Sequence, residues 1–206
     1  MIRKLALTLF LLIVAAVIAI LAIAGTRPAT YHVERSATMT APPPVVHGII
    51  NDFHRWPEWS PWQKLDPDMK TSIAGSGIGP GSSYSWTGND KVGEGRMTIT
   101  SASPPNEVAM KLEFLKPYAT TCDVHFGIRP DGNGSRVTWA MDGTNNLMSK
   151  VMTLFVSMDS MMGKDFDRGL ANLKQVSEAS AQALPATPAG GAAAAAAAAA
   201  TSAPTR

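Results

Sequence analysis

The sequence predicts an α+β fold in which a curved antiparallel sheet of about seven strands wraps around a long C-terminal helix, preceded by one N-terminal transmembrane helix. Three patterns indicate this fold. Residues 5–24 carry no charge, residues from 69 onward alternate between apolar and polar positions, and apolar residues recur at helical spacing from 147 to 178. A sheet with one apolar face and an amphipathic helix can bury their apolar surfaces against each other.

The run Leu5–Ala24 has Thr8 as its one polar residue. As a helix it would span about 30 Å, the thickness of the hydrocarbon core of a bilayer. Arg3 and Lys4 precede it and Arg27 and Arg35 follow it; with the amino terminus added, the positive charge slightly favours a cytoplasmic N-terminus and a periplasmic location for the rest of the chain. A cleaved signal peptide is the alternative, because Ala22-Ile23-Ala24 has the form of a cleavage site. We expect a membrane anchor because the apolar region of a signal is shorter, about 7–15 residues.

The next part of the chain predicts one strand and short helices. Residues 31–39 alternate as in a strand, although Arg35 interrupts the apolar face. Residues 42–44 are prolines, which end this strand and are favoured at a helix start, and residues 45–53 have apolar positions at helical spacing. The segment 56–62 contains three tryptophans that need an apolar surface to cover.

The alternating region is divided into strands by turn-forming residues at 75–81, 88–90, 104–106 and 131–134. The last predicted element is one long helix from Leu147 to Glu178, started by Asn145 or Asn146 as a cap. We therefore expect a membrane anchor at 1–27, one globular domain at 28–178 and a disordered Ala/Pro-rich tail at 179–206.

Composition excludes several classes of function. The net charge is +2 and the basic residues are scattered, which argues against nucleic-acid binding. The single cysteine, Cys122, permits no internal disulfide and falls on an apolar strand face, so we expect it to be buried and inert. The four histidines lack the convergent spacing of metal ligands, so we expect solvated surface histidines, no metal site and no cofactor.

Several motifs carry a resemblance to a known family. They are the proline-rich start of the first helix (41–46), the tryptophan-rich segment (52–62), two middle-strand motifs (93–99 and 138–143) and the sequence of the last helix (163–174). In this order they resemble the SRPBCC superfamily, which includes START domains and birch-pollen allergens, and in particular its polyketide cyclase/dehydrase-like branch. The resemblance covers residues 30–178 and implies the helix-grip fold, with a pocket between sheet and C-terminal helix. It carries over no catalytic residues.

The residues that would line such a pocket are mostly methionine and aromatic residues, with one carboxylate. Methionine is flexible and polarizable, which suits a variable apolar ligand, although a methionine-rich helical stripe is also typical of an ordinary core. The candidates are Tyr84, Trp86, Met97, Met110, Phe114, Phe126, Trp139, Met141, Met148, Met152, Phe155, Met158, Asp159 and Met162. Tyr84, Arg35 and Asp159 are the candidates for orienting a ligand.

The leading hypothesis is a membrane-tethered domain that binds a lipid or other hydrophobic small molecule, with residues 5–24 in the membrane. The first alternative is a polyketide cyclase/dehydrase-like enzyme. It would need an acid or base in the pocket, and Arg35 and Asp159 are the one pair that the sequence offers. The second alternative is an envelope interaction domain with a filled core, whose protein partner the sequence does not identify.

Overall fold

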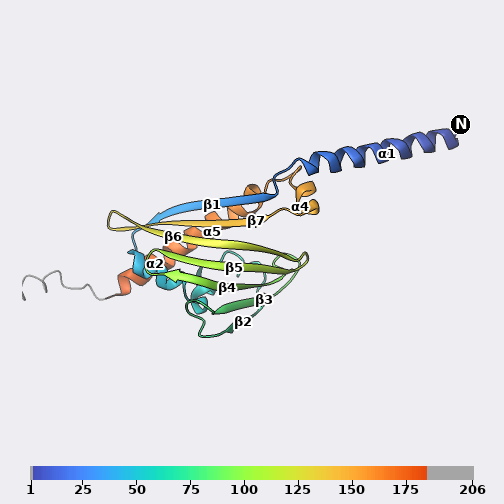
Figure 1. The fold of residues 1–206 in the computed structure, drawn as a ribbon. Helices are drawn as coiled ribbons and strands as arrows, with labels where there is room; N and C mark the ends of the chain where they lie inside the picture. The colour runs from blue at the N-terminus through green and yellow to red at the C-terminus, as the bar shows by residue number, and fades with distance from the viewer. Residues whose placement is uncertain (1, 185–206) are drawn as a thin grey trace, which may run out of the picture.

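The computed structural model describes residues 2–184 and shows one seven-stranded sheet, several helices around it, and an N-terminal helix that extends away from it (Figure 1). The elements in chain order are α1 (Ile2–Gly25), β1 (Thr30–Met39), α2 (Pro43–Ile50), a 3-10 turn η1 (Phe53–Arg55), α3 (Trp56–Trp59), β2 (Lys70–Ala74), β3 (Ser83–Thr87), β4 (Glu94–Ser103), β5 (Glu107–Lys116), β6 (Thr120–Asp131), β7 (Gly134–Thr144), α4 (Leu147–Met152) and α5 (Met158–Ala183).

All strand pairs are antiparallel, in the order β1-β7-β6-β5-β4-β3-β2. The apolar positions predicted from the alternation pair across the sheet, for example Val33 with Met141 and Phe126 with Trp139. They share the inner face because residues opposite each other in an antiparallel pair lie on the same side. The predicted helix-grip α+β fold is confirmed.

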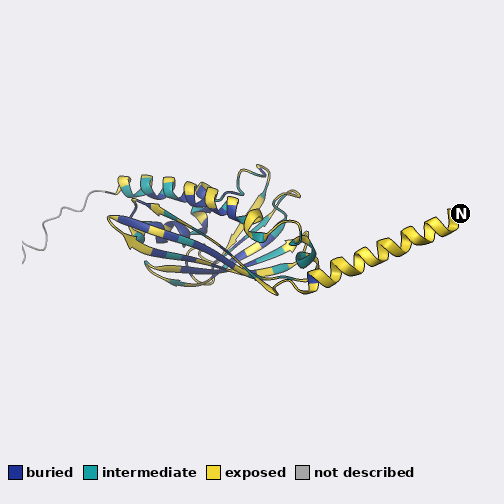
Figure 2. Ribbon diagram, turned by 90° about the horizontal axis from the view of Figure 1, so that it is seen from above, coloured by how far each residue is buried: buried dark blue, intermediate teal, exposed yellow. Residues whose placement is uncertain are grey.

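Helix α5 covers β1 and buries Phe166, Leu170 and Leu173 toward the sheet. Figure 2 shows that the buried residues of the domain are concentrated in the strands and along one side of α5. The side chain of Ser157 accepts a hydrogen bond from the amide of Ser160 and caps the start of this helix.

The C-terminal helix is not continuous, contrary to the sequence prediction. Helix α4 ends at Met152, a turn follows, and α5 begins at Met158 and runs to Ala183, beyond the predicted end at Glu178. Asn146 caps α4, as predicted, and Ser157 supplies a second cap. Several residues between α4 and Ser157 are β-branched or aromatic, and such residues have a low helix propensity. The first helix therefore ends before Ser157, and Ser157 can cap the start of a new helix.

Two predictions about buried residues have different outcomes. Cys122 is buried on the inner face, as expected. His47 is buried at 5% exposure, so the expectation that it is a solvated surface histidine was wrong. It lies on α2 between Val46 and Ile50. The helix buries these two residues against the core, and the imidazole is buried together with them.

Helix α1 is long and apolar enough to cross a membrane, and it is the one helix with these properties among residues 2–184. Its side chains are exposed along almost its whole length (Figure 2). The hydroxyl of Thr8 donates a hydrogen bond to the carbonyl of Lys4 at 3.0 Å, so the one polar side chain of the run is satisfied within the helix. The predicted tail lies outside the described residues from position 185 onward.

Candidate ligand-binding site

The strands bring the site candidates into two groups, because their ends alternate between two edges. The end of β3, the start of β4, the end of β5, the start of β6, the end of β7 and the start of β1 all lie at the edge from which α1 leaves (Figure 1). We call this edge the α1 end. The site candidates farther from the α1 end form the core of the protein. The site candidates close to the α1 end are less completely buried.

Aromatic side chains fill the deeper part of the inner face. Trp139 of β7 stacks on Phe166 of α5, with 4.3 Å between ring centroids and 8° between ring planes. Trp59 of α3 packs edge-on against both Trp139 and Phe126. The tryptophan-rich segment thus finds the apolar surface that the sequence required, and the candidates Met110, Phe126, Trp139 and Met141 are core residues at 2% exposure or less.

Two indole N–H groups in this core lack a hydrogen-bond partner among the described residues, those of Trp59 and Trp139. Trp56 differs, because its N–H donates to the carbonyl of Ile50 at 2.9 Å. Burying an unsatisfied donor costs roughly 1–3 kcal/mol. Two unused donors therefore lie among the aromatic side chains of the core.

The candidates toward the α1 end are less tightly enclosed. Tyr84 and Met97 are 7% and 8% exposed, whereas Trp86 and Phe114 are only partly buried. Trp86 and Phe114 pack edge to face with 6.1 Å between centroids. They meet across Gly95, where a Cβ would overlap the indole of Trp86, so the ring lies close against the strand backbone.

Helix α5 supplies the other side of this region. Met158 and Met162, in its first two turns, are partly buried and pack against the same core. Apolar side chains of β3, β5 and the start of α5 are thus only partly buried on this side of the core.

The remaining methionine and phenylalanine candidates do not reach the inner face. Met148 and Met152 of α4 and Phe155 of the following turn are exposed, at 58%, 48% and 77%. The prediction placed them on one helical stripe with Met158, and the break before α5 separates them from it. Met148 instead lines an apolar hollow of about 500 Å³ between α4 and α1, with Leu147, Val151, Val17, Ile20 and Leu21.

Asp159 is an exposed carboxylate in an ion pair. The guanidinium of Arg35 donates two hydrogen bonds to it, at 2.7 and 2.9 Å, and lies 3.5 Å from Asp167. The hydrogen bonds from Arg35 lower the pKa of Asp159, and the same bonds raise the pKa of Arg35. The pair is therefore held charged, which is the opposite of what a general acid or base near neutral pH requires.

The sequence analysis missed Tyr31, which lies on the inner face at the α1 end beside Cys122. Burial raises the pKa of both groups, so the phenol and the thiol stay protonated and neutral. The alternation of residues 31–39 placed Tyr31 on the apolar face. Its nearness to Cys122 could not be predicted, because it depends on β7 lying between β1 and β6 in the sheet. Among residues 2–184 no three histidine, cysteine or carboxylate groups gather as metal ligands.

Comparison with known proteins identifies the family. Residues 30–178 match the family described as "Polyketide cyclase / dehydrase and lipid transport". The chain belongs to this family, within the SRPBCC superfamily. The match begins with β1 and ends inside α5, so it covers the whole sheet and leaves out α1. The resemblance found in the sequence is confirmed.

Solved structures of other SRPBCC-type proteins share the fold. The di-domain ARO/CYC StfQ from the steffimycin biosynthetic pathway has a TM-score of 0.55 and 12% identity, over 75% of this chain and 53% of that one. MLL2253 from Mesorhizobium loti has a TM-score of 0.53 and 13% identity, over 71% and 96%. The Aha1 dimer from Colwellia psychrerythraea has a TM-score of 0.52 and 14% identity, over 72% and 96%. No curated protein sequence matches the chain.

Proposed function

We propose that this SRPBCC protein is anchored in a membrane by α1 and binds a lipid or other hydrophobic small molecule at the α1 end, between the sheet and the start of α5. The observation that carries the proposal is the incomplete burial of apolar residues on that side of the core: Trp86 and Phe114 of the sheet, and Met158 and Met162 at the start of α5. Arg3 and Lys4, which precede the apolar run Leu5–Ala24, together with the amino terminus favour a periplasmic domain.

The energetics favour an apolar ligand. A molecule that buried about 200 Å² of apolar surface there would gain roughly 5 kcal/mol before the costs of association. Few polar groups are available to orient it: the protonated phenol of Tyr31, the thiol of Cys122 and the hydroxyl of Tyr84. This combination suits a molecule that is mainly hydrocarbon with one hydrogen-bonding group.

The segment that leads into α5 is loosely packed. Helix α4 and the turn before α5 bury no residue completely, and the start of α5 is held to β1 by the Arg35–Asp159 pair. Local opening takes place where few apolar contacts are lost. A ligand would enter past this segment without disturbing the aromatic core around Trp139.

The enzyme alternative needs an acid or base among the apolar residues. The carboxylate nominated for that role, Asp159, is exposed and held ionised by Arg35. Binding without a chemical step is therefore the function that the geometry supports better.

The test is native mass spectrometry of the full chain released from lipid nanodiscs. We expect a discrete bound lipid or metabolite that Met158→Trp displaces, because the larger ring would fill the space between α5 and the sheet. Met161→Trp is the matched control, since Met161 lies on the same helix and is 42% exposed. A bare protein mass after incubation with a lipid extract would contradict the proposal, and so would a ligand that both variants retain.

A further inference from the structure

A strip of large apolar side chains lies exposed on α4 and on the turn that follows it. We call it the α4 strip: Leu147, Met148, Met152, Phe155 and Val156, whose exposed fractions run from 47% to 77%. These five residues fall within ten positions of the chain, and Met161 at the start of α5 adds a sixth exposed apolar side chain nearby. Exposed apolar patches of this kind on folded domains mark surfaces that bind a partner or a membrane.

The strip is continuous with α1 through the apolar hollow between them. Val17, Ile20 and Leu21 form one wall of the hollow, and Leu147, Met148 and Val151 form the other. Ile20 lies five residues before the end of α1 at Gly25, which corresponds to about 7.5 Å along the helix axis. A side chain on the opposite wall of the same hollow lies at nearly the same depth as Ile20.

This placement sets the environment of α4. In the proposed anchoring, Val17, Ile20 and Leu21 belong to the run that spans the hydrocarbon core, so α4 cannot stand in bulk water beside them. Lys150 is the one charged residue of α4, and a lysine stem can carry its ammonium group back to the polar headgroups. Apolar residues beside such a cation are typical of helices that lie in the membrane interface.

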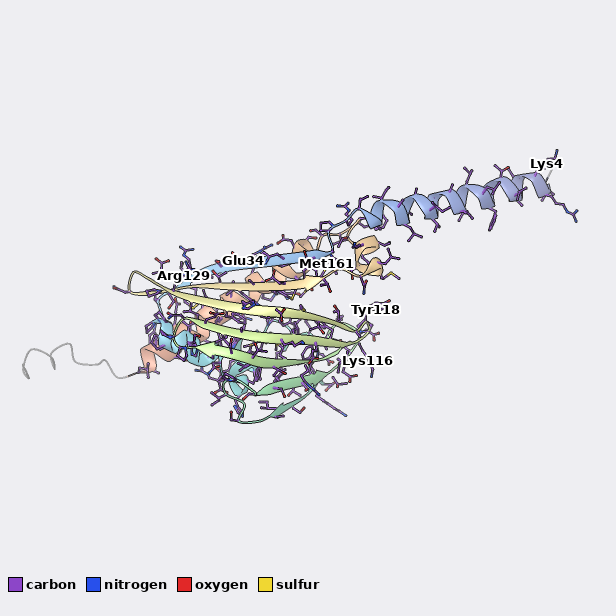
Figure 3. The ribbon with its side chains drawn as sticks, viewed as in Figure 1. Lys4, Glu34, Lys116, Tyr118, Arg129 and Met161 are labelled. Carbon is purple, nitrogen blue, oxygen red and sulfur yellow. The ribbon has the colours of Figure 1, made fainter. Side chains whose placement is uncertain are left out.

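A second apolar projection lies at the same end of the domain. The end of β5 exposes Leu115 at 49%, and the turn that follows exposes Tyr118 at 68%, with Lys116 between them. Figure 3 shows Lys116 and Tyr118 at the end that also carries α4 and Met161, whereas Arg129 lies at the opposite end. Tyrosine and lysine are residues that membrane–water interfaces favour, because each combines an apolar body with a polar tip.

We infer that the α4 strip is inserted into the interface of the same bilayer that holds α1, with the β5–β6 turn as a second contact. The occupant of the apolar hollow between α4 and α1 is then an acyl chain of a membrane lipid. This inference rests on the proposed anchoring by α1. It adds that the domain lies against the membrane with its α1 end, so the proposed ligand region opens at the lipid surface and a lipid enters without crossing water.

The test measures membrane depth with nitroxide labels on the full chain in phosphatidylethanolamine/phosphatidylglycerol vesicles. Single cysteines are introduced in a Cys122→Ala background at Phe155, at Val14 in α1 and at Arg129. Collision with oxygen indicates burial in lipid, and collision with a water-soluble nickel chelate indicates exposure to water. We expect position 155 to favour oxygen over the chelate about tenfold more than position 129, at a shallower depth than position 14. Met152→Cys gives an independent reading should Phe155→Cys fold poorly.

The outcomes separate this inference from the proposed function. A label in lipid at position 14 but in water at positions 155 and 152 would overturn the interfacial placement and leave the anchor intact. Labels in water at all positions would overturn the anchoring itself. Spin–spin broadening at position 155 that disappears on dilution with unlabelled protein would show that a second copy covers the strip, and would also overturn the inference.

Discussion

The guanidinium of Arg35, on β1, occupies the space beside the Cα of Gly163 on α5, where a Cβ would overlap it. Gly163 is buried, and Asp159, one turn earlier on the helix, holds the same guanidinium with two hydrogen bonds. An arginine from the sheet thus fills the room that a glycine leaves on the helix surface. This contact explains why Arg35 interrupts an otherwise apolar strand face.

Replacing Gly163 by alanine is expected to have opposite effects in two backgrounds. In the wild-type chain, Gly163→Ala should lower the free energy of unfolding because the new methyl group displaces the arginine from Asp159. In an Arg35→Ala background the same change should raise the free energy of unfolding by about 1 kcal/mol, because alanine is more favourable than glycine in the interior of a helix. Urea unfolding of the four proteins measures both effects, and equal signs in the two backgrounds would contradict the packing described.

The Arg35–Asp159 pair is expected to control local opening more than global stability, because both side chains are partly exposed. Asp159→Asn should raise amide hydrogen exchange several-fold over residues 158–164 and leave the strands unchanged. The pKa of Asp159 is lowered by Arg35, so its contribution is present above the ordinary aspartate pKa of 3.8 and is lost as the pH falls through the lower value. Exchange in Asp165→Asn, whose carboxylate contacts Arg168 instead, is the control.

The two neighbouring tryptophans Trp56 and Trp59 provide a matched pair. Both are buried at 2% exposure or less, but the N–H of Trp56 has a partner in Ile50, whereas that of Trp59 has none among residues 2–184. Replacement by phenylalanine removes similar volume at each position. We expect Trp56→Phe to lower the free energy of unfolding by about 1 kcal/mol more than Trp59→Phe, because it leaves a buried carbonyl unpaired. Chemical denaturation measures the difference, and an equal or reversed order would count against this account.

The sequence predicted the sheet well, because a period of two reports directly on which side of a strand is buried. Val33, Phe126 and Met141 lie where the alternation placed them. It did not predict the break at Ser157, because apolar residues continue past Met152 and a serine is tolerated inside a helix. Periodicity reports which face of a helix is buried, but it does not show where a helix is interrupted.

The candidate site was harder to predict for a similar reason. Trp86 and Trp139 have the same residue type and the same inward position, yet one is partly exposed and the other is core. What separates them is the distance to the α1 end and the position of α5, both of which are set by tertiary packing. The hollow between Met148 and Ile20 joins segments that are far apart in the chain, so no local pattern indicates it.

His47 and His32 are expected to give the protein opposite responses to pH. Burial lowers the pKa of His47, so its imidazole is neutral in the folded protein and takes up a proton more readily on unfolding. Stability should therefore fall as the pH drops below the ordinary histidine pKa of 6.5. The hydrogen bond that the imidazole of His32 donates to the carboxylate of Asp142 raises the pKa of His32, so its contribution is complete below pH 6.5 and is lost as the pH rises through the higher value.

The measurement is urea unfolding of the wild type, His47→Leu and His32→Leu between pH 5 and 8. The stability of the wild type relative to His47→Leu should rise with pH, because only the wild type carries the buried imidazole. Its stability relative to His32→Leu should fall over the same range. Each variant thus serves as the control for the other, and slopes of the same sign would show that burial of His47 does not set its protonation.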